Sequence, residues 1–193
     1  MVYGIAIMGL NGCGKSTLAH EISKRLNYFE MDVEDYYFPE QRESRKAILE
    51  HQYDVECEYL GGLPYSVPRS KKEVQEMIRD DIRKHPQFVI YGVTMKWEAD
   101  ILAAIDVAFI LEAPTDERVK RVQHREEIRF GSRVMFGGDM YEQQKEFRSI
   151  IAEKSSQTVE ESANRLTCTK VRLDGAKSID ENVAIIVKTI EKL

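Results

Sequence analysis

The sequence has few of the residues that build disulfide-rich or zinc-binding proteins. Its 193 residues include three cysteines and four histidines. No two cysteines have C-x-x-C spacing, and no two histidines form an H-x-x-x-H pair. An odd number of cysteines without such spacing argues against a disulfide framework and against a zinc site. We therefore expect a reduced, cytoplasmic protein.

Long apolar runs and an excess of positive charge are also missing. No stretch approaches the roughly 18 apolar residues of a membrane span, and the N-terminus lacks the pattern of a secretory signal. The net charge of −5 argues against a broad nucleic-acid surface, because such a surface needs cations that displace counterions from phosphates. The expected partner is a small molecule, without nucleic acid or membrane, and we expect a monomer or homodimer.

A glycine-rich segment, residues 9–16, carries the clearest chemical signal. It reads Gly-Leu-Asn-Gly-Cys-Gly-Lys-Ser and fits the Walker A pattern G-x-x-x-x-G-K-[ST], directly after the apolar run 2–8. Gly12 and Gly14 allow the backbone to curl so that its N–H groups point at phosphate oxygens. Helical spacing follows over residues 15–26, so the N-terminus of a helix would also face the phosphates. The segment predicts a binding site for a nucleoside triphosphate.

The side chains of this segment have separate expected roles. Lys15 would reach the β- and γ-phosphates, and the Ser16 hydroxyl would ligate Mg²⁺. ATP and Mg²⁺ are therefore the expected cofactors. Cys13 stands at a variable position of the pattern, where a tolerated small residue is a better explanation than a redox switch. The expected nucleotide contacts in this part of the chain are Gly9, Asn11, Gly12, Cys13, Gly14, Lys15, Ser16 and Thr17.

Short apolar runs alternate with helix-periodic segments along the chain. The expected strands are residues 2–8, 28–31, 88–91, 106–111 and 168–173. The expected helices are residues 15–26, 42–51, 71–84, 97–104, 115–129, 140–154 and 179–192. This alternation is typical of a parallel sheet with crossover helices. It predicts an α/β chain with a single-domain, three-layer P-loop NTPase fold, in which a central five-stranded parallel sheet carries a helical lid.

Local signals mark some of the expected boundaries. Two helices begin at capping boxes, Ser70 with Glu73 and Ser178 with Glu181. The glycine-containing segments 53–69 and 129–139 lack sustained periodicity and are expected to be loops. Long loops at the carboxyl ends of parallel strands are where substrates bind in such sheets.

Acidic residues follow the second expected strand. Asp32 and Asp35 stand at its carboxyl end, beside the expected nucleotide. Phosphoryl transfer needs an acceptor hydroxyl that a carboxylate orients, and a metal over the phosphates. Asp32 is the first candidate for the base or metal ligand and Asp35 the second, while a turn-capping role is the alternative. The third strand ends at Tyr91 without an acid, which leaves the metal to Ser16, Asp32 and water, or indicates weak catalysis.

Arginines recur along the expected helix 115–129. They lie on nearly one stripe of that helix, at Arg118, Arg121, Arg125 and Arg129. The last three are the expected catalytic arginines, because planar and permanently charged donors suit the charge on a transferring phosphoryl group. Three glycines in residues 131–138 would let a lid of about residues 118–139 close and exclude water. The alternative is a solvated face that is paired with glutamates.

These blocks resemble P-loop small-molecule kinases of the nucleoside and nucleoside-monophosphate kinase superfamily. Residues 9–16 are shared with P-loop NTPases in general. Residues 32–37 are similar to the Asp-Asp-Phe-Tyr-like segment of uridine-kinase relatives, where an Asp is the catalytic base, and residues 121–131 resemble their lid. Leu173-Asp174-Gly175 resembles the adenine-side loop of adenylate-kinase-like folds, which implies that Asp174 and Gly175 contact the base.

The resemblance implies an ATP-dependent phosphotransferase, with residues 1–193 as a single P-loop kinase domain. It would move the γ-phosphoryl group to a small-molecule acceptor, for which a nucleoside, nucleotide or related metabolite is preferred. The acceptor-side segment is about residues 36–84, and within it residues 42–69 match no family pattern. The alternative is an ATP-binding regulatory P-loop protein with little turnover. A GTPase-type switch would need N-K-x-D and D-x-x-G, and the sequence contains neither, and the chain is short for an ATP-dependent motor.

Overall fold

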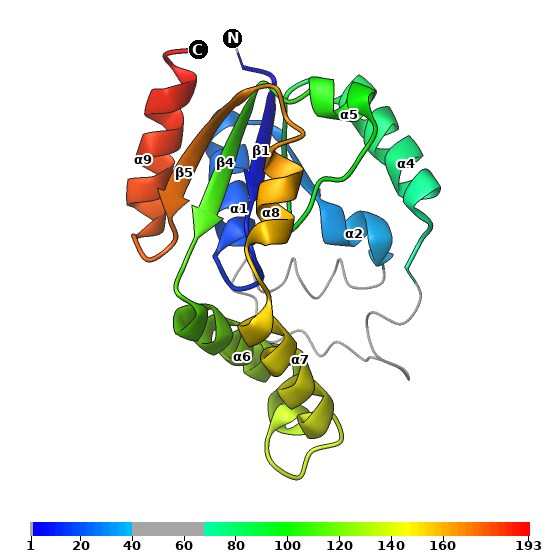
Figure 1. The fold of residues 1–193 in the computed structure, drawn as a ribbon, viewed down its shortest axis with the longest axis vertical. Helices are drawn as coiled ribbons and strands as arrows, with labels where there is room; N and C mark the ends of the chain where they lie inside the picture. The colour runs from blue at the N-terminus through cyan, green and yellow to red at the C-terminus, as the bar shows by residue number, and fades with distance from the viewer. Residues whose placement is uncertain (1, 40–67) are drawn as a thin grey trace.

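Five parallel strands form one sheet in the order β2-β3-β1-β4-β5 (Figure 1). The structure is a computed structural model that describes residues 2–39 and 68–193. The strands are β1 (Gly4–Met8), β2 (Phe29–Asp32), β3 (Phe88–Gly92), β4 (Val107–Glu112) and β5 (Thr169–Asp174). The predicted α/β class and the five-stranded parallel sheet are confirmed.

Helices cover both faces of this sheet. In Figure 1, α8 lies in front of the strands and α1 behind them, and α1 contacts α9. The helices are α1 (Lys15–Leu26), α2 (Val33–Tyr37), α4 (Lys71–Lys84), α5 (Ala99–Ala103), α6 (Thr115–Phe130), α7 (Tyr141–Glu153), α8 (Gln157–Ala163) and α9 (Ile179–Ile190), with a 3₁₀ turn η2 (Gly131–Val134). None of the helices within residues 2–39 and 68–193 has the length and apolar character that a bilayer crossing requires.

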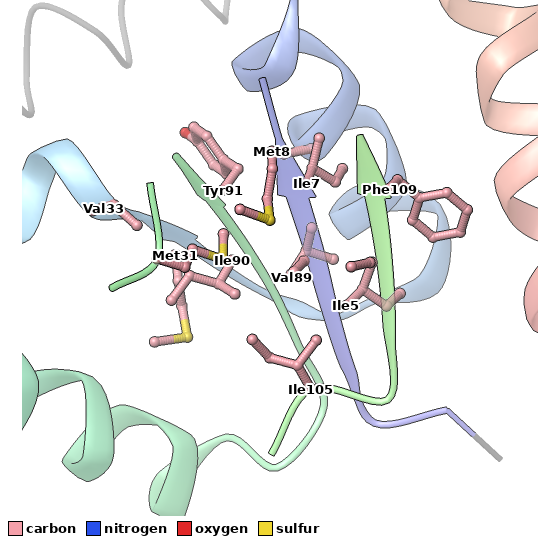
Figure 2. Packing of buried hydrophobic residues seen from close by; sticks show 14 of the residues in the cluster. Ile5, Ile7, Met8, Met31, Val33, Val89, Ile90, Tyr91, Ile105 and Phe109 are labelled. Carbon is pink, nitrogen blue, oxygen red and sulfur yellow. The ribbon is translucent and has the colours of Figure 1, made fainter. Parts of the chain in front are cut away.

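The apolar core lies along the central strands. Every residue of β1 and β3 is buried, as the continuous apolar runs of parallel strands predict. Figure 2 shows Ile5, Ile7 and Val89 among the packed side chains. Helices cover both faces of the sheet. In such sheets ligands bind beyond the carboxyl ends of the strands, and the candidate site lies there.

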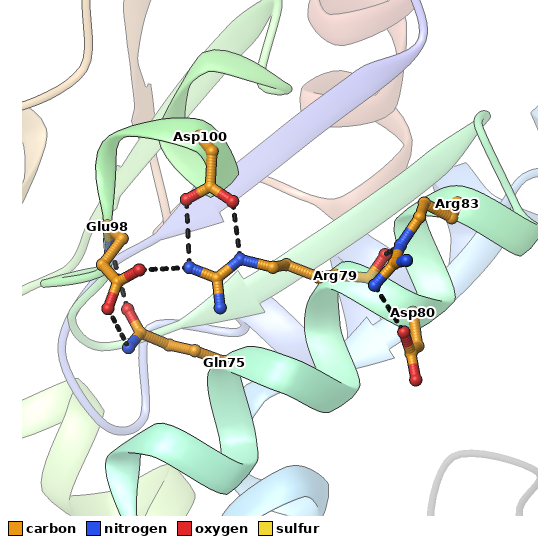
Figure 3. Close-up of polar contacts among 6 residues, drawn as sticks. All are labelled: Gln75, Arg79, Asp80, Arg83, Glu98 and Asp100. Carbon is orange, nitrogen blue, oxygen red and sulfur yellow. Dashed lines mark hydrogen bonds and ion pairs between the residues drawn. The ribbon is translucent and has the colours of Figure 1, made fainter.

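A polar network fixes α4 to the chain around the start of α5 (Figure 3). Arg79 donates from Nε to Asp100 Oδ2 at 2.5 Å, and it also pairs with Glu98. Gln75 adds a mutual contact, because its Oε1 accepts from the Glu98 N–H at 2.8 Å and its Nε2 donates to the Glu98 carboxylate at 3.3 Å. The Arg79 guanidinium lowers the pKa of the Asp100 carboxyl. The network holds α4 at the C-terminal end of the predicted acceptor-side segment.

The helix boundaries follow the sequence signals closely in places. Both predicted capping boxes are present, and α1 and α4 have the predicted bounds. The short helices α2 and α8 were not predicted, because five and seven residues are too few for a period to show.

Part of the predicted lid loop 129–139 is helical, since α6 continues to Phe130 and η2 follows. A small apolar cluster of Phe130, Val134 and Met140 holds this end together. The predicted helix 42–51 lies outside the described residues, as does most of the predicted loop 53–69.

Candidate active site

The predicted phosphate-binding loop connects β1 to α1. Gly12 and Gly14 have φ values of 83° and 97°, in the left-handed region that favours glycine. Gly14 is the N-cap of α1, so the first N–H groups of this helix are directed toward the loop. A Cβ atom on Gly12 would lie 2.3 Å from the backbone oxygen of Arg118 in α6. Glycine is therefore required at position 12 both by the loop conformation and by the close approach of α6.

Lys15 is a buried cation at the start of α1. Its Nζ donates to the Leu10 carbonyl at 3.0 Å, so the ammonium lies against its own loop. Burial lowers the pKa of Lys15, while the neighbouring charges of Glu34 and Asp32 act in the opposite direction. A ligand with negative phosphate groups would stabilise the charged form in the same way. The position and charge of Lys15 suit phosphate binding.

A cavity of about 390 Å³ opens over this loop. Its lining includes nine predicted site residues: Asn11, Gly12, Gly14, Lys15, Ser16, Thr17, Asp32, Arg121 and Arg125. Eight lining residues were not predicted to be part of the site: His20, Glu21, Glu34, Tyr91, Gly92, Val122, His124 and Ile128. The structure thus brings the loop, the end of β2 and the helix α6 together around one space.

Four predicted nucleotide contacts do not line this cavity. Gly9 and Cys13 line a second cavity of about 280 Å³, on the side of the loop that faces β4 and α8. Asp174 and Gly175 lie at the end of β5, and a Cβ on Gly175 would be 2.9 Å from the Cys13 carbonyl oxygen. The β5–α9 loop therefore packs directly on the phosphate-binding loop. The nucleotide contacts of these four residues stay predictions.

Asp32 has the capping role that was considered as the alternative, and it also lies at the cavity. Its carboxylate caps α2, because Oδ1 accepts from the Glu34 N–H at 2.8 Å, and it also lines the cavity. The residue is only 8% exposed. Asp35 is not among the lining residues, whereas Glu34 is. Of the two acids that follow Asp32 in α2, Glu34 therefore lies at the cavity, and a site role for Asp35 stays a prediction.

Tyr91 occupies the end of β3, where a carboxylate is missing. It is paired with Asp32 in the sheet register, and its hydroxyl donates to Glu30 Oε1 at 3.0 Å. The other Glu30 oxygen lies 3.0 Å from His20 Nδ1. Burial, followed by the charges of Asp32 and Glu30, raises the pKa of Tyr91 well above its ordinary value. Tyr91 therefore stays neutral and connects β3 to β2, and no sequence motif pointed to this chain of contacts.

The arginines of the α6 stripe have different surroundings along the helix. Arg121 lines the cavity and donates to the Gly175 carbonyl at 2.9 Å, and Arg125 lines it while pairing with Glu126 at 2.7 Å. The Arg129 side chain is 2% exposed, lies 3.7 Å from Glu126 and is not among the lining residues. A helix rises about 1.5 Å per residue, so Arg129 stands roughly 12 Å beyond Arg121. A phosphate contact of Arg129 stays a prediction that this placement does not support.

The oxygen atoms around Ser16 suit Mg²⁺. Ser16, Asp32 and Glu34 line the same cavity, and hydroxyl and carboxylate oxygens are ligands that Mg²⁺ prefers. No three His, Cys, Asp or Glu residues within the described ranges are grouped so that they could hold a metal by themselves. The usual Mg²⁺ site beside phosphates takes one or two protein ligands and completes its shell with phosphate oxygens and water.

Comparison with known proteins identifies the family. The family described as an AAA domain (AAA_18) matches residues 5–146, from β1 into α7. The chain belongs to this AAA-domain family. It is similar to the uncharacterized protein YqaC of Bacillus subtilis (strain 168), with 27% identity over 147 residues that cover 76% of this chain and 70% of the relative.

Solved structures show the same fold as this AAA-domain chain. A shikimate kinase from Bacteroides thetaiotaomicron has a TM-score of 0.57 at 16% identity, with 99% of each chain covered. A sugar kinase from Janibacter sp. HTCC2649 has a TM-score of 0.51 at 12% identity, covering 99% of this chain and 95% of the kinase. The resemblance to P-loop small-molecule kinases is therefore confirmed at the level of the fold.

Proposed function

We propose that this protein is an ATP-dependent phosphotransferase that moves the γ-phosphoryl group to a small-molecule acceptor. One observation carries the proposal. The buried carboxylate of Asp32 lines the same cavity as Lys15 and Ser16. A carboxylate at this place can orient an acceptor hydroxyl and accept its proton, which is a step that phosphoryl transfer needs and nucleotide binding alone does not.

The phosphates would be held by the chain's own donors. The N–H groups of the loop and of the first turn of α1 bind phosphate oxygens, and Lys15 reaches the β- and γ-phosphates. Ser16 would hold Mg²⁺, with the carboxylates of Asp32 and Glu34 beside it. When bound, Mg²⁺ offsets the negative charge of the β- and γ-phosphates. Arg121 and Arg125 approach from α6 and neutralise charge that develops during transfer.

Asp32 would act on the acceptor. Its carboxylate orients a hydroxyl of the acceptor and accepts its proton while the oxygen attacks the γ-phosphorus. The bond between that phosphorus and the β–γ bridging oxygen breaks, and ADP leaves with the electron pair. Most of the rate enhancement would come from positioning and charge compensation.

A nucleoside, nucleotide or related metabolite is the proposed acceptor. The resemblance of residues 32–37 to uridine-kinase relatives supports this class. Two solved structures with the same fold, a shikimate kinase and a sugar kinase, support a broader group of small hydroxylated acceptors. Part of the predicted acceptor-side segment, residues 40–67, lies outside the described residues.

A regulatory ATP-binding protein with little turnover is the second candidate function. The observation that favours it is Tyr91, which takes the place of a carboxylate at the end of β3 and donates its hydroxyl to Glu30. A site with one metal-orienting carboxylate fewer would still bind the nucleotide, but it would transfer phosphoryl groups slowly.

ADP release separates the two functions. The assay uses Mg²⁺ and ATP with a panel of nucleosides, nucleoside monophosphates, sugars and shikimate-like acids, and the Lys15→Ala variant is the blank. We expect one acceptor class to raise ADP release far above that of the blank. ATP binding without stimulation by any acceptor would contradict the kinase proposal and favour the regulator.

A further inference from the structure

Arg118 differs from the other arginines of α6 because it is buried away from the main cavity. It is 3% exposed, and its Nη1 lies 3.4 Å from the carbonyl oxygens of both Asn11 and Ile151. Its Nη2 donates to Thr115 Oγ1 at 3.0 Å. None of the ion pairs among the described residues includes Arg118, so its described acceptors are neutral oxygens. A buried cation in such a place stabilises nearby negative charge.

The contact with Asn11 determines how one peptide unit of the loop is oriented. In a trans peptide the carbonyl oxygen and the N–H point in opposite directions, and no cis peptide occurs within the described ranges. Gly12 lines the 390 Å³ cavity, whereas Arg118 lines the 280 Å³ cavity on the other side of the loop. Because the Asn11 carbonyl is held toward Arg118, the Gly12 N–H points away from Arg118.

Glycine makes this orientation easy to lose without a restraint. Reversing the peptide between Asn11 and Gly12 requires rotation about the Gly12 φ angle, and glycine permits both signs of φ. A reversed peptide would direct a carbonyl oxygen at the phosphates in place of an N–H donor. The loop conformation therefore needs a restraint on Asn11, and the guanidinium of Arg118 provides one.

The same guanidinium connects the loop to α7. Ile151 lies in the last turn of α7, which contains no basic residue of its own. A cation near the carbonyls at a helix C-terminus is stabilising. Arg118 therefore joins α6, the end of α7 and the phosphate-binding loop at one point, at the base of the predicted lid.

We infer that Arg118 is a positioning residue, which holds the Asn11–Gly12 peptide so that its N–H faces the phosphates and couples this peptide to α7. The inference rests on the proposed nucleotide binding. It assigns Arg118 a role distinct from Arg121 and Arg125, which line the phosphate cavity themselves.

Nucleotide affinity and one NMR signal test the inference. The Kd for Mg²⁺ and the ATP analogue AMP-PNP is measured by calorimetry for the parent, Arg118→Met and Arg118→Lys. Selective ¹⁵N-glycine labelling gives 11 amide groups, among which Gly12 is followed during the titration. The control is Arg165→Met, because Arg165 also donates to a backbone carbonyl, that of Trp97, at 2.7 Å, and no described contact joins it to the loop.

We expect Arg118→Met to weaken AMP-PNP binding about tenfold or more, and to remove the shift of the Gly12 amide signal on binding. Arg118→Lys keeps the positive charge but not the planar guanidinium with its several donors, so we expect an intermediate loss of affinity. Arg165→Met is expected to bind within about twofold of the parent. If Arg118→Met does not fold, Arg118→Lys and Thr115→Val, which removes the acceptor of Nη2, decide by the same two readouts.

Parent affinity and a parent-like Gly12 shift in the folded Arg118 variants would overturn this inference and leave the proposed function standing. Failure of the parent itself to bind AMP-PNP would overturn the proposed function, and the inference with it. An equal loss of affinity in Arg165→Met would show a general effect of stability and would also overturn the inference.

Discussion

Arg79 and Arg118 each join separate elements, but they do so in opposite surroundings. Arg79 fixes α4 to the chain around α5 through two carboxylates, Glu98 and Asp100, whose side chains are 65% and 58% exposed. Arg118 fixes α6 and α7 to the phosphate-binding loop, is almost completely buried, and donates to neutral oxygens. The first junction is a solvated ion-pair network, and the second is a buried positive charge beside a loop that is proposed to bind anions.

The difference separates a structural junction from one that serves the site. The charge of Arg79 is already balanced by its carboxylates, and exposed pairs of this kind contribute little to stability. No ion pair of Arg118 occurs among the described residues, and its guanidinium contacts the Asn11 carbonyl of the phosphate-binding loop. Substitutions around the loop and α6 should therefore change binding or turnover, whereas substitutions at the α4–α5 junction should change stability slightly.

The largest effect is expected from Lys15→Ala. Removing the buried cation of the loop should lower acceptor-stimulated ADP release about a hundredfold or more, because Lys15 supplies the positive charge that the loop places at the β- and γ-phosphates. Lys24→Ala is the control, since Lys24 is an exposed lysine of the same helix α1. Turnover that survives in Lys15→Ala at the parent rate would show that the loop is not the site of transfer.

Arg125→Ala should have the next largest effect. Because Arg125 lines the cavity on α6, its loss should lower kcat about tenfold or more and change the AMP-PNP Kd within about threefold. The comparison is sharpened by Arg129→Ala, which should lower kcat less, since Arg129 is not among the lining residues. Equal losses of kcat in the two variants would restore the phosphate role that the arginine stripe predicts for Arg129.

Arg79→Met should show the smallest effect. We expect Tm to fall by about 2 °C or less, because the pairs that it breaks are exposed, and the AMP-PNP Kd to stay within about twofold of the parent. Calorimetric unfolding and the binding assay check both quantities. A large loss of nucleotide affinity in this variant would break the distinction between the two junctions.

The pH dependence of the same junction can be followed through Asp100→Asn. The Arg79 guanidinium lowers the pKa of Asp100, so the folded protein binds this proton less readily than the unfolded chain does. The stability that results is fully present above the unfolded pKa of about 3.9 and is lost as the pH falls through the lowered folded value. The difference in Tm between parent and Asp100→Asn should therefore persist from pH 7 to about pH 4 and shrink below it. A difference in Tm that does not change with pH would contradict this.

The sequence predicted the elements in which a period and a boundary signal agree. α1 and α4 have the predicted bounds because helical spacing coincides with the glycine loop before α1 and the capping box before α4. The motif also located Lys15 and Ser16, and strand order brought Asp32 to the same edge of the sheet. These features depend on residues that are close together in the chain, or on the general layout of a parallel sheet.

The rest of the site depends on contacts that no local pattern encodes. Glu34 lines the cavity in place of Asp35 because α2 begins immediately after Asp32. The contact of Tyr91 with Glu30 follows from the pairing of β2 with β3. The spacing of the arginines predicted that they share one face of α6, but it could not show which of them reach the cavity. Arg118 is buried against the loop, whereas Arg121 and Arg125 line the main cavity.

Asp32→Asn tests the central claim most directly, with Asp35→Asn as its matched control. Both variants are assayed with the best acceptor for phosphoryl transfer and for AMP-PNP affinity. The proposed role of Asp32 predicts that Asp32→Asn loses transfer about a hundredfold or more while its Kd stays within about threefold of the parent, and that Asp35→Asn keeps most of its activity. Transfer by Asp32→Asn at the parent rate would contradict the proposal that this carboxylate makes the nucleotide site a phosphotransferase.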